Sequence, residues 1–509
     1  MGSTIELDDR LGALITELTD RWVAEHHLPG VVVSVFDRTD HLPTVARGSI
    51  DHRTSVAPTE RSRFRIASMT KSFTAAAVLA LRDDEVLDLD APIARLAPSL
   101  AGVVGPTSDA PPVTLRLLLT MSAGFATDDP WADRLLDAEP TVMDDLFERG
   151  AHHAHPTATA FQYSNYGFAM AGRVVEEVTG APLRDHVSAR LLEPLGMTDT
   201  GWDPPDVGAA TGHRWLAPIH DGDEGAWQAE LPPLADGGVA PMGGLWSSIE
   251  DLRRWVRFML DAYPARNDPD DGPLRRSSRR EQQQIHRSHG NPGMASGYGM
   301  GLQVVHDEQL GTVVTHSGGL PGFGSNMRWL VDHGLGIVAL SNLTYAPMAQ
   351  LNMAIFDRLP SLAGNAPLTV PPPSAPQVEA AHRFLIRVLE PILGDEPPDW
   401  SVDSSDSGWA INVELDEPFD RRAALIARDL ARLRRGLDTL SGNEVTFRFG
   451  PLSIQHGAAG SFTIEPVERV VPTAARGHRS KIGAPPTHLT VAFTLSAESP
   501  PKVQSLTIS

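Results

Sequence analysis

Apolar residues in the first part of the chain alternate between helical and strand spacing. Between residues 7 and 27 they recur three and four positions apart, which predicts a helix, and residues 31–36 form a short apolar run typical of a buried strand. The alanine-rich segment 68–82 and the segment 165–179 predict two more helices. Further strands are predicted at 311–315, 327–331 and 336–341. Strands at both ends with helices between them predict an α/β domain whose sheet is closed by segments distant in sequence.

Five prolines occur within residues 367–376, where neither a helix nor a central strand can continue. This segment is predicted to be a semi-rigid linker. It separates a larger domain, residues 1–366, from a small α+β domain, residues 377–509, for which we expect an accessory role. Within the smaller domain the pattern predicts helices at 378–393 and 421–437, a strand at 409–415 and four strand-like segments.

The chain carries 43 basic and 64 acidic residues, a net charge of −21, and its surface should therefore repel nucleic acid and anionic lipid. The densest basic run, residues 275–280, lies in a polar stretch and is interpreted as a solvent-exposed loop. No segment reaches the roughly 18 uninterrupted apolar residues that a membrane-spanning helix needs. The first 20 residues lack the features of a secretory signal, so a cytoplasmic location is expected.

Metal and cofactor chemistry has little support in the sequence. The absence of cysteine excludes disulfides, a thiol nucleophile and thiolate metal ligands. Three histidines, His152, His153 and His155, form a tract that lacks the companion residues of a zinc site and is interpreted as an exposed loop. Neither a Walker loop nor a convincing dinucleotide fingerprint is present. We therefore expect no metal and no cofactor.

Ser68 and Lys71 form a pair with a chemical use. Three residues apart in a helix, a hydroxyl and an amine lie on one face, one turn apart. Serine attacks a carbonyl only if a base takes its proton, and a lysine serves as that base where its site favours the neutral amine. The spacing therefore suggests a serine nucleophile with a lysine base.

Lysine usage strengthens this interpretation. Only Lys71, Lys481 and Lys502 are lysines, and the other 40 basic residues are arginines. Arginine cannot replace a lysine base because the guanidinium does not deprotonate in proteins. The same spacing recurs at Ser499 and Lys502, but the two prolines between them exclude a helix interior. The first pair is the candidate and the second is a decoy.

Two more segments carry side chains suited to the same chemistry. Tyr163 and Asn165 lie where the helix 165–179 begins, and a tyrosine of lowered pKa acts as a general base or relay. His316 follows an apolar run and is expected at the end of an edge strand. Gly318 and Gly319, after it, would let a substrate lie against that strand, with the N–H groups of Gly319 and Ser68 directed at an oxyanion.

These three segments, in this order, resemble the three motifs of class C β-lactamases, low-molecular-weight penicillin-binding proteins, family VIII esterases and D-aminopeptidases. The likeness extends over about residues 10–360. It implies an antiparallel five-stranded sheet flanked by helices, a helical subdomain and a cleft between them. Further similar stretches are 118–124, 193–197, 243–248 and 298–302.

The resemblance also implies roles for the residues. Ser68 would carry an acyl-enzyme, Lys71 and Tyr163 would share its proton and deliver it to the leaving group, and Asn165 would hold the substrate amide or Lys71. One departure is His316, because β-lactamases typically have a lysine there to bind the drug's carboxylate. A histidine, largely neutral at pH 7 unless perturbed, is a weaker anchor and favours neutral esters, D-amino-acid amides or peptides.

Several functions remain open on this evidence. The first choice is a serine hydrolase acting on small carboxylic esters or on D-amino-acid amides and short peptides. The alternatives are a β-lactamase or D-Ala-D-Ala carboxypeptidase, an acyltransferase that uses an alcohol or amine in place of water, and a non-catalytic penicilloyl sensor. The sequence does not indicate an oligomeric state.

Overall fold

Strand β1 (Gly30–Phe36), near the N-terminus, pairs antiparallel with β12 (Leu335–Ser341) in the computed structural model, with Val31 opposite Ser341. This pairing confirms that segments distant in sequence close the sheet. The strand order is β2-β1-β12-β11-β10-β9-β8-β7. The remaining strands are β2 (Val45–Gly48), β7 (Arg287–Ser288), β8 (Ser296–Tyr298), β9 (Gln303–Asp307), β10 (Gly311–Leu320) and β11 (Phe323–Leu330).

The sheet is antiparallel throughout, as expected, but it has eight strands where five were predicted. The five longest strands, β1, β12, β11, β10 and β9, are neighbours and form its centre. The extra strands β2, β8 and β7 are short and lie at the two edges. Such short edge strands carry little hydrophobic periodicity, and they form because the longer neighbour provides the backbone partners.

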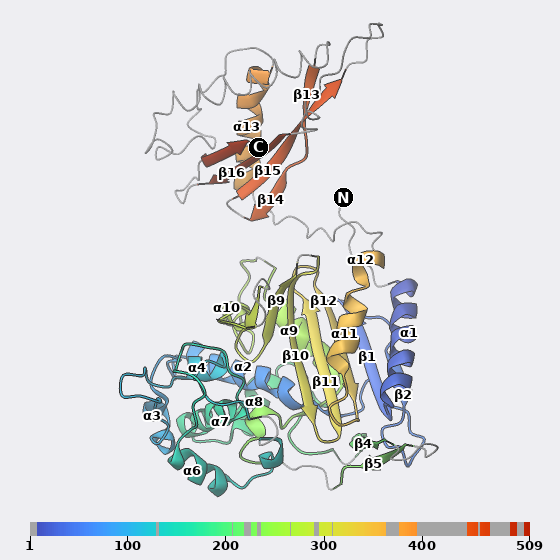
Figure 1. Ribbon diagram of the computed structural model, residues 1–509, viewed down its shortest axis with the longest axis vertical. Coiled ribbons are helices and arrows are strands. Elements are labelled where there is room, and N and C mark those ends of the chain that lie inside the picture. Colours follow the sequence, from blue (N-terminus) through green and yellow to red (C-terminus); the bar gives the residue numbers. More distant parts are fainter. Residues whose placement is uncertain are drawn as a thin grey trace. The chain divides into compact units, whose positions relative to one another are not determined.

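Both faces of the sheet are covered, which explains the continuous apolar run of β1. Val31, Val33 and Val35 pack with α1 (Asp9–His26) and α11 (Met348–Phe356) in one hydrophobic cluster. Figure 1 shows α1 and α11 on the same side of the sheet. Val32 and Phe36 point to the other face, where α9 (Ile249–Leu260) packs against β12 and β1.

The helical part of this unit lies beside the sheet (Figure 1). Its central helix, α2 (Thr70–Asp83), is buried along almost its whole length and packs against α7 (Asn165–Thr179). Small alanine side chains on α2 allow this close approach on several sides at once. The helices around this pair are α3 (Ile93–Leu96), α4 (Leu115–Leu119), α6 (Pro140–Arg149) and α8 (Leu183–Val187).

The basic run 275–280 was expected in an exposed loop, and this expectation is wrong. Most of it forms helix α10 (Arg276–Gln282), in which Arg276 and Arg279 are buried. Arg276 donates to Asp268 at 3.1 Å, and Arg279 lies 3.6 Å from Asp261 and stacks on the Phe258 ring. Paired carboxylates and an aromatic face let these two side chains leave water, so part of a run of charges that resembled a solvated loop is buried.

The chain divides into two compact units, Met1–Val370 and Pro371–Ser509. The second unit contains helix α13 (Pro376–Leu393) and a sheet of order β13-β15-β16-β17, with β14 also paired to β15. Its strands are β13 (Val445–Phe449), β14 (Ser453–His456), β15 (Ala459–Glu468), β16 (Leu489–Leu495) and β17 (Val503–Ile508). Phe384 and Leu389 of α13 are buried, as are Phe462 and Ile464 of β15, and the two elements are in contact.

The structure describes residues 8–128, 132–205, 207–217, 225–231, 236–264, 266–289, 295–307, 309–362, 376–393, 445–456, 459–468, 489–495 and 503–508. The predicted strand 409–415, the predicted helix 421–437 and most of the proline-rich segment 367–376 lie outside these residues. Within them, no helix combines the length and apolar character needed to cross a bilayer.

Candidate active site

A sharp turn between a strand and a helix presents Ser68. The two-residue strand β3 (Phe64–Arg65) pairs with β6 (Trp246–Ser247), and the 3-10 turn Ala67–Met69 follows before α2 begins at Thr70. Ala67 has a φ of 49°, in the left-handed region that non-glycine residues seldom occupy. The predicted helix 68–82 therefore starts two residues later than expected, because the strained turn places Ser68 just ahead of it.

The amine of Lys71 reaches Ser68, as the spacing predicted. Its Nζ donates to Ser68 Oγ at 2.9 Å, to Asn165 Oδ1 at 2.7 Å and to the main-chain oxygen of Met242 at 2.8 Å. Lys71 is fully buried. Asn165 Oδ1 and the Met242 carbonyl only accept, so in a neutral amine they take its two N–H groups and the lone pair faces Ser68.

Asn165 is held at the N-terminus of α7 by a capping carboxylate. Asp128 accepts from the N–H groups of Asn165 at 2.7 Å and Tyr166 at 2.8 Å, and Ser164 caps the helix through Gly167. These bonds satisfy N–H groups that a helix start otherwise leaves unpaired. Burial raises the pKa of Asp128, opposed by these N–H groups and by the charge of Lys71. The sequence analysis did not identify Asp128, since no motif marks it.

Tyr163 lies between the lysine and the third segment. Lys71 Nζ is 5.0 Å from the centre of the Tyr163 ring, and the rings of Tyr163 and His316 are 6.4 Å apart. Tyr163 is half-buried and lines the same pocket as Ser68. The structure thus brings together the side chains of the three segments that the sequence singled out.

His316 lies inside a strand and not at its end, which corrects the expectation. Strand β10 continues to Leu320 and lies between β9 and β11. Its pairing with β9, however, stops at Thr315, and from His316 onward the described strands pair with it only on the β11 side. The second half of β10 is therefore a local edge, and it faces the pocket.

Two hydrogen bonds determine the state of the His316 ring. Its Nδ1 lies 2.7 Å from the carbonyl oxygen of Ser317, which can only accept, so Nδ1 carries the proton. Its Nε2 then accepts from the hydroxyl of Tyr298 at 2.9 Å. Burial, together with the charge of Lys71, lowers the pKa of His316 to about 3. The ring is neutral at physiological pH.

Gly318 and Gly319 occupy positions where no side chain fits. A Cβ at Gly318 would come within 2.1 Å of the Ile66 carbonyl oxygen, and one at Gly319 within 2.6 Å of the Tyr345 ring. The close approach at Gly318 brings β10 against the turn that carries Ser68. Ser325 on β11 adds a bond from its hydroxyl to the Ile66 carbonyl at 2.9 Å. The N–H groups of Ser68 and Gly319 therefore lie on adjoining segments.

A pocket of about 630 Å³ opens onto Ser68. One wall contains Asp133, which is buried and accepts from the hydroxyl of Tyr345 at 2.5 Å. The sequence analysis identified neither residue, because each lies far in sequence from the three motifs. The described lining residues include no lysine and no arginine and are Ser68, Asp133, Phe161, Tyr163, His289, Gln303, His316, Ser317, Gly318, Gly319, Ser325, Tyr345, Ala346, Pro347, Ala349 and Gln350.

The histidine tract does not gather into a site. His152 and His155 are exposed, and the His153 ring packs on Phe125 at 5.1 Å between centroids.

Comparison with known proteins agrees with this arrangement. The model of the β-lactamase family matches residues 12–359. The chain belongs to the β-lactamase family. Among its relatives is esterase EstB of Burkholderia gladioli, 29% identical over 386 residues, which are 68% of this chain and 94% of the esterase.

Two solved structures share the β-lactamase-family fold. The octameric penicillin-binding protein homologue of Pyrococcus abyssi superimposes with a TM-score of 0.58 at 17% identity, covering 98% of this chain and 95% of that one. The D-amino acid amidase of Ochrobactrum anthropi SV3 superimposes with a TM-score of 0.56 at 24% identity, covering 70% of this chain and 99% of the amidase. The relatives of this family member thus include hydrolases.

Proposed function

We propose that this β-lactamase-family chain is a serine hydrolase that forms an acyl-enzyme on Ser68. The observation that carries the proposal is the position of Lys71 Nζ, 2.9 Å from Ser68 Oγ, with two fixed acceptors on its other sides. A neutral amine in this cage directs its lone pair at the serine hydroxyl. That is the geometry a base needs before the serine can attack.

The proton and electron pairs then follow a balanced course. As Ser68 Oγ bonds to the substrate carbonyl carbon, its proton passes to Lys71, and Tyr163 relays a proton to the leaving alcohol or amine as the scissile bond breaks. Water next attacks the acyl-enzyme, loses a proton to the same pair, and Ser68 Oγ leaves with a proton. The ester or amide is thereby hydrolysed to an acid and an alcohol or amine, with no external oxidant or reductant.

The developing oxyanion needs donors that are in place before reaction. The N–H groups of Ser68 and Gly319 are proposed for this role, because Gly318 allows β10 to lie directly against the Ser68 turn. A side chain at Gly318 would separate the two segments. Preorganised N–H donors of this kind typically contribute on the order of 10²-fold or more to the rate.

The charge of the pocket supports small esters and D-amino-acid amides as substrates. Neutral His316 supplies no permanent cation for a substrate carboxylate. Asp133 places a carboxylate on the pocket wall, which favours a neutral substrate or one with an ammonium group. An amino-acid amide or ester with a free amine fits this distribution, and a carboxylated β-lactam does not. The esterase relative supports the ester branch of the proposal.

A substrate panel with paired variants tests the proposal. Purified protein is assayed with short-chain nitrophenyl esters, D-alanine nitroanilide and nitrocefin, and labelled with a fluorescent fluorophosphonate. Ser68→Ala should lose both labelling and turnover, because it removes the hydroxyl next to Lys71. Ser499→Ala, in the proline-containing decoy, should keep both. Thermal unfolding of both variants controls for folding.

Three results of this panel would each contradict a different part of the proposal. Labelling of wild type without steady turnover of any ester or amide would indicate a sensor and contradict the hydrolase. Faster turnover of nitrocefin than of every ester and amide would contradict the substrate class. Labelling that persists in Ser68→Ala would overturn the assignment of the nucleophile.

A further inference from the structure

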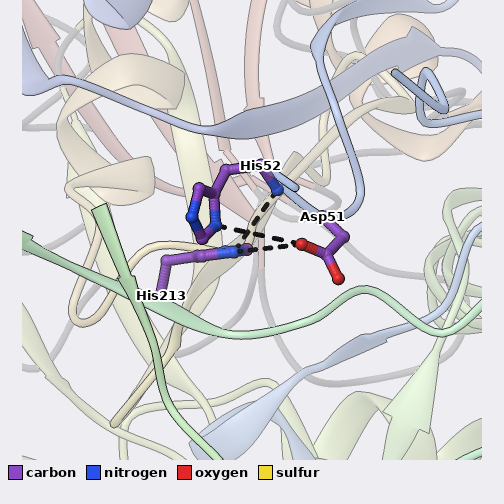
Figure 2. Close-up of side chains that lie close together, drawn as sticks. All are labelled: Asp51, His52 and His213. Carbon is purple, nitrogen blue, oxygen red and sulfur yellow. Dashed lines mark hydrogen bonds and ion pairs between the residues drawn. The ribbon is translucent and has the colours of Figure 1, made fainter. Parts of the chain in front are cut away.

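Three side chains of the first unit converge outside the pocket described above. Asp51 and His52 lie on the loop after β2, and His213 begins strand β4 (His213–Leu216). The carboxylate oxygen Asp51 Oδ1 is 3.8 Å from His52 Nδ1 and 3.8 Å from His213 Nε2. Dashed lines mark both contacts in Figure 2. The three potential ligand atoms all lie within 4.8 Å of one another. Among the described residues this is the one such cluster.

Each ring has one nitrogen near this centre, His52 Nδ1 and His213 Nε2. His213 Nδ1 lies 3.3 Å from the carbonyl oxygen of Asn342, so Nδ1 is protonated and donates. Its Nε2, on the other side of the ring, accepts the long 3.4 Å bond from the main-chain N–H of His52. His52 Nδ1 is buried without a hydrogen-bond partner. His213 has one ring nitrogen near the centre and the other tied to a carbonyl, an arrangement typical of metal-binding histidines.

The charges of the surroundings also suit a cation. His213 is fully buried, so its ring is shielded from water. The carboxylate of Asp51 accepts hydrogen bonds from the guanidinium of Arg53. Arg53 is itself a competitor, because its Nε donates to Asp51 Oδ1 at 3.0 Å. Half of its side chain is exposed, so its departure costs little.

We propose that Asp51, His52 and His213 form a binding site for a divalent transition-metal ion, with Zn²⁺ as the occupant. Two imidazole nitrogens and one carboxylate are donors of intermediate softness, and such a set suits Zn²⁺ better than Mg²⁺ or Ca²⁺. Binding would draw the three atoms together, since tetrahedral ligand bonds of about 2.0–2.2 Å place the ligand atoms about 3.3–3.6 Å apart. Water would complete the coordination.

The site would add a link between the loop at Asp51 and the segment that begins at His213. Strand β4 forms a two-stranded sheet with β5 (Ala226–Ala229), separate from the eight-stranded sheet. A metal held by His213 and by the loop at Asp51 would tie this hairpin to the end of β2. The Thr344 N–H donates to the His213 carbonyl at 2.7 Å, and the next residue, Tyr345, lines the pocket. The proposed metal is structural, and it stands independently of the hydrolase proposal.

Zinc titration of the full-length protein, stripped with a chelator and lacking a polyhistidine tag, tests the site. Isothermal titration calorimetry with zinc sulfate should give one equivalent bound at micromolar affinity, and zinc should raise Tm by about 3 °C or more. His52→Ala and Asp51→Asn should weaken binding at least tenfold. The matched control, His152→Ala with His155→Ala, should bind as wild type does. Arg53→Gln, which removes the competing cation, should tighten binding about threefold.

Three results would contradict the proposed zinc site. No zinc binding by wild type, unchanged affinity in His52→Ala, or loss of binding in the histidine-tract control would each overturn the site. If His52→Ala fails to fold, Arg53→Gln decides alone, since this residue is exposed. Binding that is unchanged or weaker in Arg53→Gln would then count against the proposal. Esterase activity is not the readout, so failure of the hydrolase proposal leaves this test intact.

Discussion

The hydroxyl of Tyr298 donates to Nε2 of His316 at 2.9 Å. Because the ring's other nitrogen donates to the Ser317 carbonyl, this contact fixes His316 as a neutral imidazole. The sequence resemblance suggested a histidine in the place of a lysine, and the structure shows how that histidine is kept uncharged. Four predictions follow from this contact and from the pocket beside it.

The first prediction concerns the pH dependence of stability. The pKa of His316 falls from 6.5 to about 3 on folding, so between these values the unfolded chain binds more protons than the folded one. Its contribution to the unfolding free energy is complete above pH 6.5 and is lost progressively as the pH falls toward 3. As the pH falls through this range, the unfolding free energy of the wild type should therefore decrease relative to that of His316→Gln, by up to about 1.4 kcal/mol per pH unit. Denaturant unfolding of both proteins across this range measures the difference, and parallel curves would contradict it.

The second prediction concerns His316→Lys. A lysine would bring a permanent charge to the open edge of β10, and charge-assisted hydrogen bonds to a substrate carboxylate contribute about 1.5–3 kcal/mol. The kcat/KM ratio of nitrocefin to nitrophenyl acetate should then rise about tenfold or more. His316→Gln is the matched neutral control and should leave the ratio close to that of wild type. An unchanged ratio in His316→Lys, with both activities retained, would show that this position does not set the preference.

The third prediction concerns Asp133. If its buried carboxylate attracts a substrate ammonium group, Asp133→Asn should reduce kcat/KM for D-alanine nitroanilide about tenfold. The N-acetylated nitroanilide, which has no ammonium group, should be affected much less. Asp137→Asn, an exposed neighbour outside the pocket lining, serves as the control. Equal losses for both substrates would assign Asp133 a structural role only.

The fourth prediction concerns Lys71→Arg. The charge is retained, but a guanidinium does not accept the Ser68 proton and is too large for a site without solvent exposure. Loss of acid–base catalysis typically costs about 10²–10⁴-fold in rate, so kcat for the best ester should fall by this amount. Lys502→Arg, in the decoy pair of Ser499 and Lys502, should leave this kcat unchanged. Single-turnover acylation rates measure the effect directly, and a rate near that of wild type would refute Lys71 as the base.

Local patterns in the sequence were sufficient for much of the fold. The helices at Asp9–His26 and Asn165–Thr179 and the strand Gly30–Phe36 agree closely with the predicted ranges. Their periodicity and end signals lie within one short segment. The contact between Ser68 and Lys71 was also predictable from one short segment, because the separation of three residues almost alone determines it.

The rest depended on contacts between segments far apart in the chain. Nothing local to the run 275–280 shows that acidic partners and an aromatic ring would bury its arginines. Tyr298 reaches His316 because β8 and β10 both border β9 in the sheet, and Asp128 reaches Asn165 because a separate segment caps α7. The sequence by itself determined which residues are candidates for the chemistry, since residue type and short spacing specify them. Only the tertiary structure decided their charge states and neighbours, because burial and long-range hydrogen bonds have no signature in a single segment.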